Sequence, residues 1–64
     1  MTVWIELADG TKRTFEKVER IIERQGRIEL MKLVPGSGER IVAGYQKSQI
    51  NSLGNSRILS QRAH

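Results

Sequence analysis

Side chains that could carry catalysis are scarce in this 64-residue sequence. It has no cysteine, and its single histidine is His64, the last residue, where a chain is expected to fray. A serine or threonine nucleophile needs a neighbouring base, and no interior histidine can provide one. Glu16, Glu19 and Glu23 are interleaved with lysine and arginine, which is typical of a solvated face. We therefore expect a protein that is not an enzyme.

Recognisable metal and phosphate motifs are also missing. Asp9 is the only aspartate, so the converging oxygen ligands of a calcium or magnesium site are not expected. The absence of cysteine excludes a thiolate site. The glycine-rich segment 35-PGSGER-40 lacks the lysine and the following serine or threonine of a phosphate-binding loop. It is better interpreted as a hairpin loop, and no cofactor is predicted.

Binding chemistry is better represented, because aromatic and cationic side chains occur together. Trp4 lies on the face of its segment opposite Val3 and Ile5, and Tyr45 lies in a segment without acids. Exposed aromatic side chains can stack on bases while neighbouring cations hold phosphates. Both aromatics could instead complete a core that has one other aromatic, Phe15. The candidate partner-binding residues are Trp4, Lys12, Arg13, Arg27, Arg40, Tyr45 and Lys47.

The positive charge is concentrated in the second half of the chain. The formal net charge is +4, and residues 1–34 carry seven basic and six acidic side chains. From Arg40 onward there are four basic side chains and no acid, which raises the local concentration of anions. The expected partner is nucleic acid or an acidic protein surface, and an anionic nucleotide held by an oligomer is a further possibility. A merely solubilising surface is the alternative that needs no partner.

The length predicts a single small domain, residues 1–54, followed by a basic C-terminal tail, residues 55–64. Domains of this size bury only about 60% of the surface that the unfolded chain exposes. Because disulfides are excluded, self-association is the remaining reinforcement, and we expect a homo-oligomer. No apolar run approaches the roughly 20 residues that span a bilayer, and the N-terminus lacks the pattern of a secretory signal. A cytoplasmic protein without membrane contact is expected.

Apolar alternation and turn residues predict several β-strands. Val3, Ile5 and Leu7 alternate with polar residues or Trp4, which indicates a half-buried strand. The expected order is strand 2–7, turn 8–10, strand 27–34, turn 35–38, strand 39–45 and a short turn or 3-10 element at 46–54.

The segment 14–25 allows two interpretations. The first is an amphipathic helix, because Phe15, Val18, Ile21 and Ile22 share one face at helical spacing. Thr14 can cap its N-terminus, and Gly26 can end it. Alternatively, the segment is strand that bends between Phe15 and Val18 and reverses in a tight hairpin at 23-ERQG-26.

The pattern over residues 2–53 resembles the small SH3-like and Sm-like barrels of short phage and mobile-element proteins. The matching positions are Asp9, Gly10, Phe15, Val18, Ile21, Gly26, Ile28, Leu30, Tyr45 and Ile50. The resemblance implies an all-β fold, a five-stranded barrel whose second strand bends midway and whose last strand follows a short 3-10 turn. The alternative fold is α+β with the order β-α-β-β.

The resemblance also bears on function. Together with the cations and aromatics above, it leads us to expect a non-catalytic binding module for an anionic partner such as nucleic acid, with a phage-type protein that inhibits or adapts a host protein as the alternative. The RNA-contacting loop residues of Sm proteins are absent, so their mode of binding uridine-rich RNA is not implied.

Overall fold

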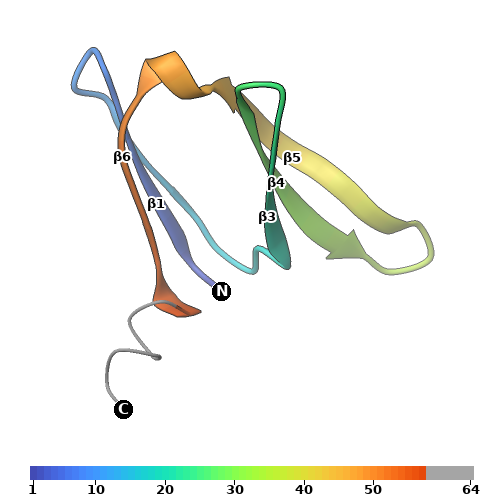
Figure 1. Ribbon diagram of the computed structural model, residues 1–64. Helices are drawn as coiled ribbons and strands as arrows, with labels where there is room; N and C mark the ends of the chain where they lie inside the picture. Colours follow the sequence, from blue (N-terminus) through green and yellow to red (C-terminus); the bar gives the residue numbers. More distant parts are fainter. Residues whose placement is uncertain (58–64) are drawn as a thin grey trace.

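The computed structural model describes residues 1–57 and is built from β-strands arranged in two antiparallel sheets (Figure 1). The first sheet has the order β2-β1-β6 and the second has the order β3-β4-β5. The strands are β1 (Val3–Leu7), β2 (Lys12–Phe15), β3 (Arg20–Arg24), β4 (Arg27–Val34), β5 (Gly38–Gln46) and β6 (Ile50–Asn55), with the 3-10 helix η1 at Lys47–Gln49. The predicted all-β class is confirmed.

The prediction of a closed five-stranded barrel is wrong. The described residues form six strands, and β5 and β6 pair only within their own sheets, so the barrel does not close. The extra strand arises where a bend was expected. β2 ends at Phe15, Lys17 has a left-handed φ of 58°, and the chain resumes as β3 in the other sheet.

The helical alternative for residues 14–25 is also wrong. β3 pairs with β4 from Arg20 opposite Met31 to Arg24 opposite Arg27. The turn residues Gln25 and Gly26 have φ values of 51° and 72°, the positive pair that a tight type I′ hairpin requires. Helical spacing was misleading because pairing with β4 overrides local propensity. The predicted hairpin at residues 23–26 is therefore confirmed.

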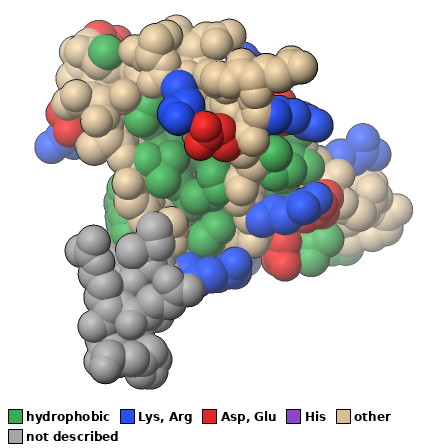
Figure 2. Space-filling view, in the orientation of Figure 1, with side chains coloured by type: hydrophobic (Ala, Val, Ile, Leu, Met, Phe, Trp, Pro, Cys, Tyr) green, Lys and Arg blue, Asp and Glu red, His purple; other side chains and the backbone are tan. Residues whose placement is uncertain are grey.

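A small apolar core lies between the two sheets. Its buried members are Val3, Ile5, Val18, Ile28 and Leu30. Figure 2 shows hydrophobic side chains filling this space, with lysine and arginine side chains around its border. Two hydrogen bonds join Met1 to the buried residue Val18. The Met1 ammonium donates to the Val18 carbonyl at 2.8 Å, and the Val18 N–H donates to the Met1 carbonyl at 2.8 Å.

The hairpin of β4 and β5 continues past the core. Arg20 of β3 pairs with Met31, and beyond that point β5 is the only strand within residues 1–57 that pairs with β4. The register shifts between Leu30 and Met31, which leaves Val42 as the extra residue of a β-bulge. We call residues 32–42 the distal arm. Its turn, at residues 35–37, falls where the proline and glycines predicted it.

The predicted 3-10 turn is present as η1, but it ends at Gln49, and residues 50–54, expected to belong to it, are part of the strand β6. The Gln49 side-chain oxygen accepts a hydrogen bond from the Gln46 N–H at 3.1 Å. No helix in residues 1–57 is long and apolar enough to cross a membrane. The predicted tail, residues 55–64, lies for the most part outside the described residues.

Candidate functional site

The outer side of the sheet β2-β1-β6 carries the candidate site. Val3 and Ile5 point into the core, so alternation places Trp4 and Glu6 on the side facing away from it. Residues directly opposite one another on paired strands share a side of the sheet. The registers therefore define an outer face made of Trp4, Glu6, Lys12, Thr14, Ser52 and Gly54.

Trp4 lies at the centre of this outer face. It is 40% exposed, and its paired neighbours are Thr14 on β2 and Gly54 on β6. A side-chain carbon at Gly54 would be 3.5 Å from Cε3 of the indole, an ordinary van der Waals contact, so the ring lies directly beside this glycine. An open depression of about 260 Å³ borders Trp4. Trp4 is thus a surface residue and not a member of the core.

The polar groups on the outer face are mixed in charge. Glu6 lies opposite Lys12 on one side and opposite Ser52 on the other, and the Ser52 hydroxyl donates to its carboxylate at 3.4 Å. Lys12 is exposed and has no carboxylate within ion-pair distance among residues 1–57. A cation, a carboxylate and two hydroxyls therefore surround the indole.

Arg13 borders the same depression from the edge strand β2. It pairs with Ile5, so its side chain leaves the strand on the face opposite to Lys12. Because β2 is an edge strand, Arg13 is nevertheless exposed. The consecutive cations Lys12 and Arg13 thus extend from opposite faces of β2.

The nearby turn is stabilised by Asp9. Its carboxylate accepts a hydrogen bond from the Thr11 N–H at 2.9 Å. Hydrogen bonding from Thr11 lowers the pKa of Asp9 below its ordinary value, and the positive charge of Arg13 contributes in the same direction. The turn that brings β2 beside β1 is therefore best formed when this carboxylate is ionised.

Tyr45 belongs to a different region. It pairs with Ile28 and packs against the core cluster. It also borders a second depression, of about 310 Å³, between the β1–β2 turn and η1. The structure therefore does not bring Tyr45 together with Trp4.

The three remaining predicted cations lie away from the outer face. Arg27 pairs with Glu29 at 3.7 Å, and its guanidinium covers Gly44, where a side-chain carbon would lie 2.5 Å from Nη2. Lys47 pairs with Glu23 at 2.9 Å.

Arg40 is exposed on the distal arm and lies opposite Lys32. Of the seven predicted residues, the structure gathers Trp4, Lys12 and Arg13 around one depression.

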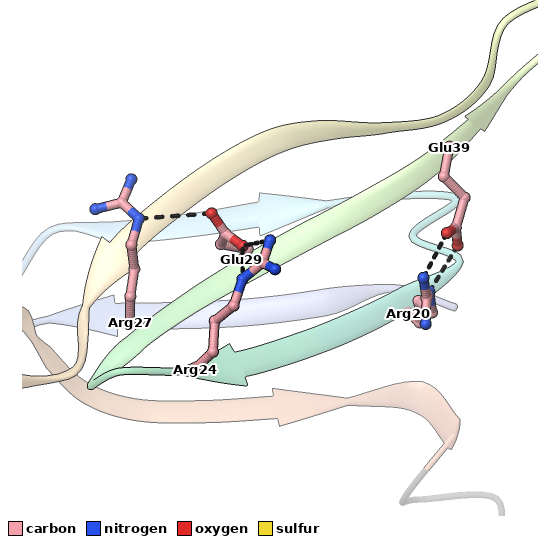
Figure 3. A network of polar contacts seen from close by, with 5 residues as sticks. All are labelled: Arg20, Arg24, Arg27, Glu29 and Glu39. Carbon is pink, nitrogen blue, oxygen red and sulfur yellow. Dashed lines mark hydrogen bonds and ion pairs between the residues drawn. The ribbon is translucent and has the colours of Figure 1, made fainter.

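The sheet β3-β4-β5 carries a network of ion pairs that sequence reasoning did not find (Figure 3). Arg20 donates to both carboxylate oxygens of Glu39, at 2.8 and 2.6 Å. Glu29 is nearly buried and is shared by Arg24, at 2.8 Å, and Arg27. The hydrogen bonds from Arg20 lower the pKa of Glu39. Each of these arginines has a carboxylate partner, but Arg24 and Arg27 share the single charge of Glu29.

The hydroxyls of the outer face, Thr14 and Ser52, were not predicted, and neither was the role of Gly54. The alternation of Leu53 with polar neighbours was the available signal, because it places Ser52 and Gly54 on the side away from the core. In residues 1–57, no three acidic, histidine or cysteine side chains converge as metal ligands would. Comparison with known proteins found no matching family model, no matching curated protein and no matching solved structure.

Proposed function

We propose that this chain is a non-catalytic binding module that holds single-stranded nucleic acid against the outer face. The observation that supports this most is the exposed indole of Trp4, beside an open depression and next to a cation without a carboxylate partner in the described chain. An aromatic ring on an open sheet surface stacks with any base, and stacking contributes about 1–3 kcal/mol per base.

The charges of the outer face indicate how a single strand of nucleic acid would lie on it. Lys12 and Arg13 are on the edge strand β2, whereas Glu6 is on the central strand β1. A phosphate would be repelled by Glu6 and attracted by the two cations, so the backbone of the nucleic acid follows β2. The bases then point across the sheet toward Trp4, where Glu6, Thr14 and Ser52 offer hydrogen-bonding groups to their edges.

Binding of a labelled single-stranded oligonucleotide of about ten nucleotides, measured by fluorescence anisotropy, tests this proposal. Trp4→Ala should weaken binding about 5- to 150-fold, the equivalent of losing one stacked base. Lys12→Gln should weaken it less and make the salt dependence shallower. Lys17→Gln is the matched control, because Lys17 is an exposed lysine outside the outer face. Unchanged affinity in Trp4→Ala would refute the proposal.

An acidic protein surface, including a host protein inhibited by a phage-type partner, remains the second candidate, and an anionic nucleotide remains the third. The resemblance to SH3-like or Sm-like barrels also remains a prediction. Binding to nucleic acid or to an acidic protein surface should weaken as the salt concentration rises, whereas binding to an uncharged partner should not. Nuclease treatment should abolish binding to nucleic acid and leave binding to a protein unchanged. Binding of a free nucleotide would raise the melting temperature as its concentration increases.

A further inference from the structure

The distal arm leaves aliphatic side chains uncovered. Leu33 is 59% exposed, Ile41 52% and Val42 42%. Met31 pairs directly with Ile41, and Leu33 follows Met31 by two residues on the same strand. The side chains of Met31, Leu33 and Ile41 therefore lie together on the side of the sheet away from the core. We call Met31, Leu33 and Ile41 the arm patch.

Ion pairs accompany the arm patch on the same side of the sheet. Arg20 pairs with Met31 across the strands, and Glu39 pairs with Leu33, so the bidentate ion pair between them crosses the patch (Figure 3). Because each charge already has its partner, the pair can be covered without leaving an isolated buried charge. Apolar side chains beside charges that are already paired are compatible with the composition of a protein–protein interface.

Addition of a partner strand to the edge of β5 is a less suitable way to cover this region. β5 pairs only with β4, so its outer edge is free in the described chain. The bulge at Val42 interrupts the regular spacing along that edge, and bulges are among the features that prevent edge-to-edge pairing. The arm patch is thus better covered by a surface packed face to face.

We propose that a second copy of this chain packs its arm patch against this one around a two-fold axis. The charges favour a copy over a charged partner, because the ion pair at the arm patch, Arg20 with Glu39, is neutral and leaves neither sign in excess there. Two such surfaces present no strong repulsion to each other, whereas a polyanion approaching the arm patch would meet Arg20 already paired with Glu39. A two-fold arrangement uses the same patch on both chains, so the assembly closes at a dimer.

This dimer leaves the outer face free, because Trp4 and Lys12 belong to the other sheet. The two proposals therefore fail or succeed separately. Ile41→Arg places a charge in the patch of both chains at once, and Ile41 is exposed enough for the substitution to leave the core intact. Val34→Arg is the matched control, since Val34 is 39% exposed on the same arm but on the opposite side of the sheet.

Sedimentation equilibrium over a range of concentrations measures the result. The wild-type chain should approach twice the monomer mass of 7.3 kDa. Ile41→Arg should weaken association at least tenfold, and Leu33→Gln should weaken it in the same direction, whereas Val34→Arg should have little effect. Far-UV circular dichroism checks that each variant is folded. A wild-type monomer at all concentrations, a larger assembly, or equal effects of Ile41→Arg and Val34→Arg would overturn the proposal.

Discussion

Lys17 is held in a backbone conformation that suits glycine better than lysine. Its φ is 58°, in the left-handed region, at the break between β2 and β3. The following residues prevent this conformation from relaxing. The Val18 N–H bonds to the Met1 carbonyl at 2.8 Å, and the Glu19 N–H bonds to the Met31 carbonyl at 2.7 Å. The Lys17 side chain is exposed and makes no hydrogen bond or ion pair to another residue in the described range.

Lys17→Gly should therefore stabilise the protein. A left-handed conformation destabilises a residue with a side chain by about 1–2 kcal/mol. Glycine loses more backbone entropy on folding, which offsets about 0.5–1 kcal/mol of that gain. The expected net effect is about 0.5–1 kcal/mol, which raises the melting temperature of a domain of this size by about 2–8 °C.

Thermal unfolding followed by circular dichroism provides the assay, and Glu16→Gly provides the control. Glu16 is the preceding exposed residue and does not have a positive φ, so glycine there should lower the free energy of unfolding by about 0.5–1 kcal/mol. In a helix spanning residues 14–25, both glycines would be interior and both would destabilise by similar amounts. A melting temperature lowered equally by the two substitutions would refute the strand break at Lys17.

Two further predictions concern the core and the ion pairs. Leu30 is fully buried, so Leu30→Ala should destabilise the protein by about 2–5 kcal/mol and lower the midpoint of its urea denaturation; an unchanged midpoint would contradict the assigned core. The pKa of Glu39 is lowered by Arg20, so the stabilisation from this pair is present above the ordinary carboxyl pKa of 4.5 and is lost as the pH falls through the lower, folded value. The melting temperature should therefore decrease as the pH is lowered below about 4.5, and Glu39→Gln should reduce that decrease; an identical pH profile in the variant would contradict this role.

Much of the local structure could be predicted from the sequence because it depends on short-range patterns. Alternation placed Val3 and Ile5 on the core face and Trp4 on the opposite face, but it left open whether Trp4 is buried. Glycine and proline located the main turns, and a competing strand interpretation of residues 14–25 anticipated the hairpin. The number of strands could not be predicted, because nothing local distinguishes a bent strand from a break at Lys17.

The site was less predictable because its geometry depends on register. Thr14 and Gly54 lie beside Trp4 only because strands far apart in sequence pair with β1 at particular positions. For the same reason, the ion pairs of Arg27 with Glu29 and of Lys47 with Glu23 could not be predicted from the order of charges along the sequence. Composition could identify the cations, but only cross-strand pairing decides which of them have a carboxylate partner.

Fluorescence of Trp4 during titration with an unlabelled single-stranded oligonucleotide tests the proposed function most directly, since Trp4 is the only tryptophan in the sequence. Stacking of a base on the indole should change its emission in a saturable manner. Phosphate contacts by Lys12 and Arg13 predict a slope of about −1.4 in log affinity against log salt, or about sevenfold weaker binding from about 50 to about 200 mM salt. Emission that does not respond to the oligonucleotide, or an affinity that does not change with salt, would contradict nucleic-acid binding at the outer face.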